Sequence, residues 1–153
     1  MAHPAPTPVH VPPVADVAAT WQRILLLTAR VENKLAAVLQ RRHGIGLSEY
    51  RALGHLVASP TSELRMQELA DKVGLNQSSV TRLVARLNAA DFAYRDLCAD
   101  DKRGVYAVIT DTGRAKYAEA SRTYEETLSD ALKEEGQADP QLAAALAALG
   151  ALS

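Results

Sequence analysis

The feature that most constrains this chain is a pair of short apolar repeats joined by a three-residue link. Residues 66–73 and 80–87 each carry apolar side chains at the i, i+3, i+4 and i+7 positions of an amphipathic helix. In the link, Gly74 suits the left-handed residue that ends the first helix, Leu75 can fill the angle between the helices, and Asn76 is a good N-cap for the second. The segment therefore predicts a helix-turn-helix.

A β-hairpin is predicted directly after this segment. Residues 92–98 and 105–110 are rich in β-branched and aromatic side chains, and they flank a polar turn at 99–104. Leu64, just before the first helix, can enter a short strand that pairs with the hairpin. A hairpin after a helix-turn-helix is a winged helix, so we expect a mainly α fold with a small β-hairpin wing.

The outward face of the second helix has the side chains that read nucleic acid. If Leu83 and Leu87 face the core, the opposite face presents groups that contact base edges and phosphates, and the hairpin adds cations at its tip and base. The predicted DNA-binding residues are Gln77, Ser78, Ser79, Thr81, Arg82, Arg86, Arg95, Lys102 and Arg103.

Each of these residues also has a plainer interpretation. Arg82 and Arg86 can be solvated helix charges, and Asp101 with Arg103 can be an ordinary ion pair of a turn. Arg95 can pair with a neighbouring aspartate instead of a phosphate. Next to a helix-turn-helix, we interpret Asp101 as the residue that orients Arg103 for a narrow minor groove, where the negative potential is enhanced.

Several short segments together resemble the MarR family of multiple-antibiotic-resistance-type regulators. The order of the pieces carries the resemblance, with an Asp-x-Arg at the wing tip and a Thr-x-x-Gly that restarts a helix. The matching segments are Glu68-Leu69-Ala70, Gly74-Leu75, residues 79–87, Asp101-Lys102-Arg103-Gly104 and residues 109–114, and the likeness covers about 21–135. One departure is Arg65, which stands where the family usually has Thr or Ser, so that Glu68 lacks its capping-box partner.

The resemblance implies a function and a mechanism. It implies a sequence-specific regulator that binds double-stranded DNA at a pseudopalindromic operator, acting as a repressor that a small-molecule effector releases. It also implies a homodimer whose first and last helices interleave, with recognition helices in major grooves about one turn, ~34 Å, apart.

Two helices are predicted before the helix-turn-helix. The first runs from Val14 to about Arg42 and is ended by Gly44. The second opens at residues 47–50, with Leu47 or Ser48 near its cap, and stops before Ser59-Pro60 because proline disfavours helical geometry in the residue before it. The apolar face of the first helix comprises Val17, Trp21, Ile24, Leu25, Thr28, Val31, Leu35, Val38 and Leu39.

Two more helices are predicted after the hairpin. Thr110 is the N-cap of a helix that continues to about Glu135 and is broken by Gly136, and its apolar residues are Ala115, Ala118, Tyr124, Leu128 and Leu132. Pro140 fits the first turn of a final helix that ends near Leu149. That last helix carries an apolar seam of Leu142, Ala145, Leu146 and Leu149.

The apolar surfaces of the first and last helices predict self-association. A winged-helix domain of about ninety residues cannot cover both of them, whereas a second subunit can. We therefore expect a flexible, proline-rich arm at 1–13 and a single domain at 14–153. Within that domain, residues 14–46 and 112–153 form the dimerisation helices and residues 47–111 form the DNA-binding winged helix.

Composition and charge restrict which other functions are possible. The net charge of −1 over 153 residues is unusual for a nucleic-acid binder, but the charge is segregated: five cations face one anion at 21–42, and seven anions face two cations at 119–139. There is no catalytic constellation, phosphate loop or metal-ligand spacing, so we expect no enzyme, no cofactor and no metal site. The absence of a secretory signal or membrane span predicts a cytoplasmic protein.

A small-molecule pocket follows from the resemblance. MarR-like regulators bind phenolic or anionic effectors in a cleft between the dimerisation helices and the winged helix. The residues expected to approach this cleft are Trp21, Arg23, Ile24, His43, Tyr50, His55 and Leu56. Some of these can be plain core, as for a histidine on an apolar helix such as His55, and the sequence names neither the effector nor the operator.

Two other functions stay open at this stage. A winged helix can serve as a protein-interaction module without affinity for DNA. Alternatively, the single cysteine, Cys98, can make the protein an oxidant-sensing regulator. The anions Asp96, Asp100 and Asp101 disfavour the reactive thiolate, which favours a structural role for Cys98.

Overall fold

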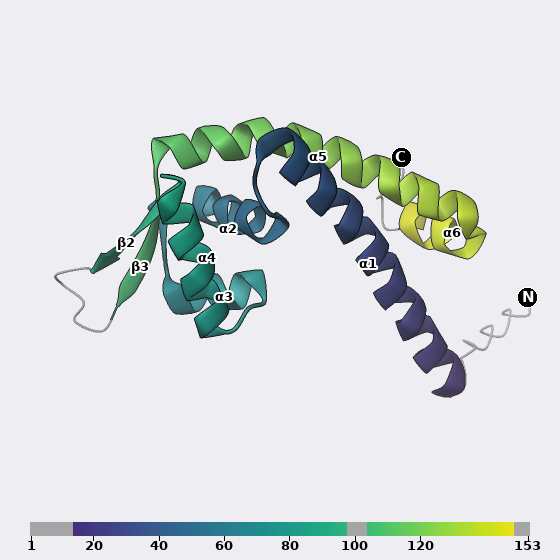
Figure 1. Ribbon diagram of the computed structural model, residues 1–153. Helices are drawn as coiled ribbons and strands as arrows, with labels where there is room; N and C mark the ends of the chain where they lie inside the picture. Colours follow the sequence, from purple (N-terminus) through teal and green to yellow (C-terminus); the bar gives the residue numbers. More distant parts are fainter. Residues whose placement is uncertain (1–13, 98–103, 149–153) are drawn as a thin grey trace, which may run out of the picture.

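The computed structural model describes residues 14–97 and 104–148, which fold into helices around one small sheet (Figure 1). In chain order the elements are α1 (Val14–His43), α2 (Leu47–Ala58), β1 (Glu63–Arg65), α3 (Met66–Val73), α4 (Gln77–Ala89), β2 (Ala93–Leu97), β3 (Val105–Ile109), α5 (Asp111–Ala138) and α6 (Pro140–Ala148). The long helix α5 runs from the sheet to α6, and α1 packs along it. The predicted fold class, a winged helix flanked by helices from both ends of the chain, is confirmed.

The structure bears out the local signals at three of the predicted helix boundaries. Gly74 follows α3 in the left-handed conformation, with φ of 76°. The side-chain oxygen of Asn76 accepts the N–H of Ser79 at 2.8 Å and caps α4, and the hydroxyl of Thr110 accepts the N–H of Gly113 at 2.9 Å and caps α5. Arg65 precedes α3 without a side-chain capping bond, as its residue type predicts.

The wing is an antiparallel sheet in the order β1-β3-β2. Leu64 pairs with Ala107, which in turn pairs with Arg95 on the other side, so these three residues share one face of the sheet. Ala107 is fully buried on that face, whereas the opposite face carries Arg65 and Tyr106. One face of the sheet therefore packs on the helices, and the predicted pairing of Leu64 with the wing is confirmed.

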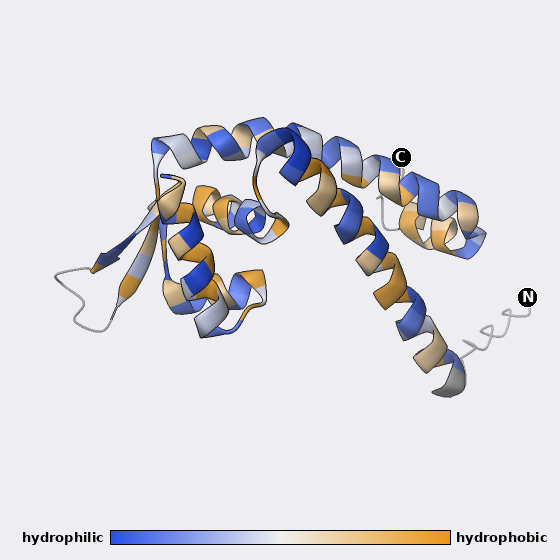
Figure 2. Cartoon of the chain, in the orientation of Figure 1, coloured by the Kyte–Doolittle hydropathy of each residue, from blue (hydrophilic) through white to orange (hydrophobic). Residues whose placement is uncertain are grey.

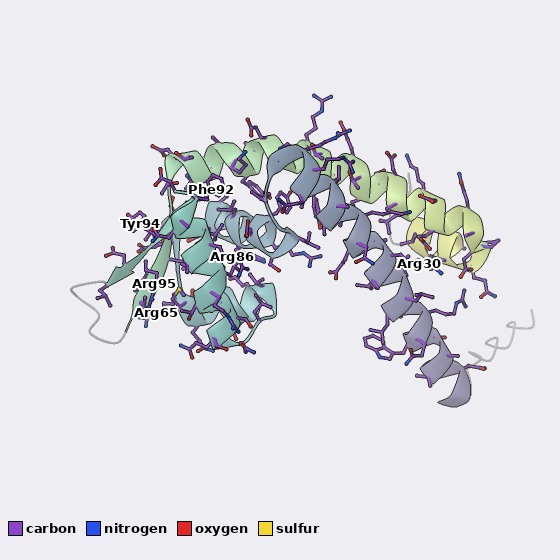
Figure 3. All side chains as sticks on the ribbon, viewed as in Figure 1. Arg30, Arg65, Arg86, Phe92, Tyr94 and Arg95 are labelled. Carbon is purple, nitrogen blue, oxygen red and sulfur yellow. The ribbon has the colours of Figure 1, made fainter. Side chains whose placement is uncertain are left out.

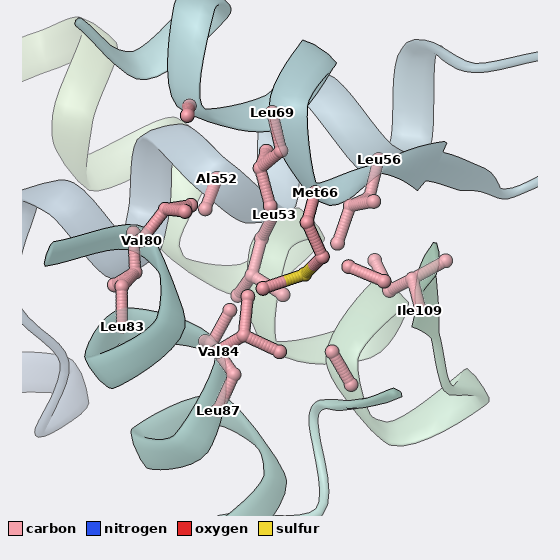
Figure 4. Close-up of a cluster of buried hydrophobic side chains, with 13 residues drawn as sticks. Ala52, Leu53, Leu56, Met66, Leu69, Val80, Leu83, Val84, Leu87 and Ile109 are labelled. Carbon is pink, nitrogen blue, oxygen red and sulfur yellow. The ribbon is translucent and has the colours of Figure 1, made fainter. Parts of the chain in front are cut away.

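The main hydrophobic core lies inside the winged helix (Figure 4). It joins side chains of α2, α3, α4 and the sheet, and most of them have no exposed surface. Burying one such leucine stabilises a fold by about 1.5–3 kcal/mol. The fully buried members from the helices are Ala52, Leu53, Leu56, Leu69, Val80, Leu83, Val84 and Leu87.

The basic first helix and the acidic C-terminal segment are brought together by the packing of α1 on α5. Three ion pairs span this contact: Arg23 with Asp139, Arg30 with Glu135 at 3.4 Å, and Lys34 with Glu134 at 2.6 Å. At least one partner of each pair is more than half exposed, so each pair contributes little energy. The charge segregation seen in the sequence is thus partly neutralised between neighbouring helices.

Gly136 does not break α5, contrary to the sequence prediction. The helix continues through this buried glycine to Ala138. Gly136 and Ala143 line the same surface hollow, so two small residues lie where α6 folds back on α5. Close packing here overrides the low helix propensity of glycine, and the helix ends instead before Pro140, where Asp139 is extended.

Two further predictions need correction. The N-cap of α2 is Gly46 rather than Leu47 or Ser48, because the Glu49 carboxylate accepts the Gly46 N–H at 3.1 Å and closes the first turn there. On α5, Ala115 and Ala118 are exposed, and the buried positions are Gly113, Ala120, Thr123, Ala131 and Gly136. Ala131 is the buried residue of α5 that packs with Val31 and Leu35 of α1, and the predicted Tyr124, Leu128 and Leu132 pack around it partly buried.

The N-terminal half of α1 exposes apolar surface. Val31, Leu35, Val38 and Leu39 are buried against α5, α2 and the α1–α2 junction, as predicted for the second half of the stripe. The first half projects away from the winged helix (Figures 1 and 2). Its exposed apolar side chains are Val17, Trp21, Ile24, Leu25 and Leu26. The predicted arm at 1–13 and Leu149 of the predicted seam lie outside the described residues.

Candidate nucleic-acid interface

Helix α4 is held by its buried face so that its opposite face is turned to solvent. Val80, Leu83, Val84 and Leu87 have no exposed surface, while Gln77, Ser78, Arg82 and Arg86 are exposed and Ser79 and Thr81 are half-buried. The division between the two faces is the one that the sequence predicts. An exposed polar helix face ahead of a β-wing has the shape and chemistry to enter a major groove.

The polar side chains of the first turn of α4 are partly engaged by the helix itself. Ser78 donates its hydroxyl to the Asn76 side chain at 2.9 Å, and Thr81 donates to the Gln77 carbonyl at 2.8 Å. Within residues 14–97 and 104–148, Gln77 and Arg82 make no such bond. Their side chains remain available to an external partner.

Arg86 is tied to α2, which sequence reasoning missed. Its Nε donates to Oε1 of Glu49 at 3.2 Å, and Oε2 of the same carboxylate accepts the Gly46 N–H at 3.1 Å. The Glu49 side chain is 20% exposed and that of Arg86 is 57% exposed. Because the two residues are 37 positions apart, no local sequence pattern predicts the pair.

The wing presents cations on both of its faces. Arg95 is exposed and shares the face of Leu64 and Ala107, which packs on the helices nearer the base of the wing. Arg65 lies on the other face, with its guanidinium 5.4 Å from the centre of the Tyr106 ring. Figure 3 shows Arg65, Arg86 and Arg95 on the side of the molecule formed by α4 and the wing. The predicted tip residues Asp101, Lys102 and Arg103, together with Cys98, lie outside the described residues.

The seven predicted effector-pocket residues are not brought together. Tyr50 and His55 line one cavity, and Arg23 and Ile24 line another. Leu56 is fully buried in the core of the winged helix, so it lines neither. Trp21 is exposed on α1, and His43 hydrogen-bonds the Thr123 hydroxyl at 2.8 Å. In the single chain, α1 diverges from the winged helix toward its N-terminus, which separates Arg23 and Ile24 from Tyr50 and His55.

The first cavity, which we call the tyrosine pocket, lies between α2 and α5 and measures about 360 Å³. Its residues are Tyr50, Arg51, Gly54, His55, Tyr117, Tyr124 and Glu125. The Tyr50 ring is stacked between Tyr117 and Tyr124, with ring centres 5.0 and 4.5 Å apart. Burial raises the pKa of the Tyr50 hydroxyl to about 12, although its hydrogen bond with Ser121 opposes the shift.

His55 connects this pocket with the helix-turn-helix. Burial lowers the pKa of its imidazole, and the nearby charge of Lys72, at the end of α3, lowers it further. Gly54, one residue earlier, leaves room for Tyr117: a Cβ there would come within 3.0 Å of the Tyr117 ring. The tyrosines of α5 and the glycine of α2 are therefore pocket residues that sequence reasoning did not name.

The second cavity, of about 340 Å³, lies between the N-terminal half of α1 and α6. Asp139 caps α6 by accepting the N–H groups of Gln141 and Leu142 at 3.1 and 3.3 Å. Its ion pair with Arg23 and these backbone bonds lower the pKa of the carboxyl. The other lining residues are Thr20, Ile24, Leu27, Leu142 and Ala145, which are mostly apolar.

The described residues hold neither a metal cluster nor a membrane-spanning helix. Residues 14–97 and 104–148 contain no cluster of three or more His, Cys, Asp or Glu side chains that could hold a metal ion. No helix in those ranges is long and apolar enough to cross a membrane. Among the described residues, the exposed face of α4 and the wing are the strongest candidate for a functional site.

Comparison with known proteins identifies related regulators. A family model described as MarR family matches residues 43–104, from the end of α1 through the wing. A MarR family transcriptional regulator from Streptomyces coelicolor, solved in complex with DNA, is 26% identical with a TM-score of 0.72 and covers 97% of this chain and 92% of its own. A MarR/EmrR family regulator from Acinetobacter sp. ADP1 is 27% identical with a TM-score of 0.67, covering 88% and 93%.

A mutant MarR from E. coli complexed with operator DNA has the same fold at 18% identity, with a TM-score of 0.68 and coverage of 78% and 84%. No curated protein sequence matches the chain. The structural likeness thus extends over nearly the whole length, whereas the sequence likeness centres on the winged helix.

Proposed function

We propose that the chain is a member of the MarR family and a sequence-specific transcriptional regulator that binds double-stranded DNA as a homodimer. The observation that carries the proposal is the exposed polar face of α4, set by a fully buried opposite face and flanked by a wing that exposes Arg95. A relative of similar length and fold has been solved with DNA. The proposal includes a cytoplasmic location and no catalytic activity.

We assign the reading of bases to α4 and the general affinity for DNA to the wing. Gln77 and Arg82 are exposed at the start and middle of α4, where side chains reach base edges. Ser78, Ser79, Thr81 and Arg86 complete this surface, and Arg95 extends it along β2. Lys102 and Arg103, oriented by Asp101, are proposed contacts at the wing tip.

The homodimer is supported by the apolar surface at the N-terminal half of α1. Five large apolar side chains there are each more than 40% exposed in the single chain. The largest exposed apolar patch of a monomeric protein is often a functional interface. Residues 14–46 and 112–153 are thus proposed as the dimerisation helices, and two-fold symmetry matches a pseudopalindromic operator.

The effector remains part of the proposal and is placed in the tyrosine pocket. Its stacked aromatic rings, with Arg51 and His55 at the rim, suit a phenolic or anionic molecule that stacks on an aromatic face and accepts hydrogen bonds. In this mechanism the free protein represses, and the occupied pocket favours a spacing of the two winged helices that no longer fits the operator.

The experiment is a binding titration on duplexes selected by the protein from a random pool. The wild-type chain should bind a pseudopalindrome, with affinity that falls steeply as salt increases. Arg82→Ala should weaken operator binding by about 1–3 kcal/mol and relax selectivity at one position of each half-site. Arg122→Ala removes a cation from the exposed face of α5 and should leave the affinity unchanged. Failure of the wild-type chain to enrich any duplex would favour a protein-interaction module instead.

A further inference from the structure

We propose that Glu49 is a positioning residue for DNA recognition, which orients the Arg86 guanidinium of α4 from the first turn of α2. The inference rests on the proposed function and concerns a residue outside the DNA-contacting set. Its basis is a carboxylate with two partners: Oε1 accepts from Arg86 Nε at 3.2 Å, and Oε2 accepts from the Gly46 N–H at 3.1 Å.

The atoms used in this bond leave the rest of the arginine free. Arg86 binds Glu49 through Nε, so its two terminal amino groups make no hydrogen bond or ion pair within residues 14–97 and 104–148. Those groups are the ones that an arginine presents to a phosphate. A guanidinium that is already held in one direction loses less rotamer freedom when it binds. Glu49 therefore prepares Arg86 for a contact outside the protein.

The carboxylate is itself held in place. Its side chain is only 20% exposed, whereas that of Arg86 is 57% exposed, so the acid is the fixed partner and the base is the outward one. The bond to Gly46 closes the N-terminus of α2 directly after the α1–α2 junction, where Ile45 is 1% exposed. The position of the Arg86 side chain is thus fixed relative to the junction between the dimerisation helix and the winged helix.

Charge alone predicts the opposite behaviour for Glu49. A carboxylate near a DNA-binding face repels phosphates, so its removal should tighten binding if repulsion is all that it contributes. If it positions Arg86, its removal should weaken binding although the protein becomes less acidic. The two accounts differ in sign, which makes the substitution Glu49→Gln decisive.

The experiment measures operator affinity and its salt dependence for Glu49→Gln, Arg86→Ala and the double variant. Glu49→Gln should weaken operator binding by about tenfold, which corresponds to about 1.4 kcal/mol. It should also lower the slope of log affinity against log salt by about one for each arginine no longer held at a phosphate. In the Arg86→Ala background the same change should have no further effect, because the two substitutions remove one interaction.

The matched control is Glu68→Gln, which removes an exposed carboxylate from the first turn of the neighbouring α3. It should leave operator affinity unchanged or slightly tighter. Melting temperatures of all variants report on folding, because Glu49 also closes the first turn of α2. Should Glu49→Gln fold poorly, Arg86→Lys keeps the test: it retains the charge but lacks Nε and the planar fork, and it should bind the operator more weakly.

Three results would overturn the assignment. One is wild-type or tighter affinity in Glu49→Gln. Another is a full loss of operator affinity on adding Glu49→Gln to Arg86→Ala, which would show that Glu49 acts only as a helix-capping residue. The third is wild-type affinity in Arg86→Lys. Failure of the proposed function looks different, because the wild-type chain then binds no duplex, and this inference falls with it.

Discussion

The exposed stripe of α1 gives a sharp test of self-association through Trp21. This side chain is 56% exposed in the single chain. With a total area of about 250 Å² for a tryptophan, about 140 Å² remains to be covered by a partner. At about 25 cal/mol per Å², complete covering would contribute about 3.5 kcal/mol in each protomer. Two-fold symmetry counts the contact twice, so Trp21→Glu should destabilise the dimer by about 3.5 kcal/mol even if only half of this area is covered.

That loss raises the dissociation constant of the dimer about three-hundredfold. Sedimentation velocity over a range of protein concentrations measures the change directly, and circular dichroism reports whether the helices persist. Gln22→Glu is the matched control, because it adds the same charge to an exposed polar position one residue along. The reasoning would be refuted by a Trp21→Glu protein that dimerises like the wild type, or by an equal effect of Gln22→Glu. Loss of operator binding should accompany loss of the dimer.

Two further predictions concern stability. In Gly113→Ala, the new Cβ would overlap the Phe92 carbonyl oxygen, which accepts the Thr110 N–H, so the free energy of unfolding should fall by about 1–3 kcal/mol. Thr112→Ala, on the exposed side of the same turn, should leave it unchanged. Equal melting temperatures for the two variants would contradict this. Because the pKa of His55 is lowered in the folded chain, its stabilising contribution is complete above its ordinary value of 6.5 and is lost as the pH falls through the lowered pKa. His55→Gln should therefore flatten the decline of the melting temperature below pH 6.5, and an unchanged pH profile would show that His55 does not cause it.

The parts of the fold that the sequence predicts are those fixed by neighbouring residues. The left-handed Gly74 and the caps at Asn76 and Thr110 each act within four residues, so they can be predicted from the local sequence. The buried face of α4 follows equally from the 3.6-residue repeat. The prediction that Gly136 ends its helix was wrong. Glycine has a poor helix propensity, and only the position of α6 against α5 shows that a missing side chain is favourable there.

The site was predicted less completely than the fold. The outward face of α4 follows from the buried one, but the partner of Arg86 does not, because Glu49 lies in another helix. The tyrosine stack was not predicted for the same reason. Tyr117 and Tyr124 are seven residues apart and share a face of α5, yet the sequence does not say that Tyr50 will lie between them. Contacts of this kind depend on the register between helices, which no periodicity encodes.

Helix α2 links these features, since it contributes to all of them at once. Leu53 and Leu56 belong to the core of the winged helix, Tyr50 belongs to the tyrosine stack against α5, and Glu49 holds Arg86 of α4. A packed helix moves as a unit, because interiors are dense and resist local deformation. If a molecule in the tyrosine pocket displaces Tyr50 together with α2, we therefore expect Glu49, one residue away, to move relative to α4. An occupant of the pocket can then reach the DNA-binding face through the orientation of Arg86 as well as through the spacing of two subunits.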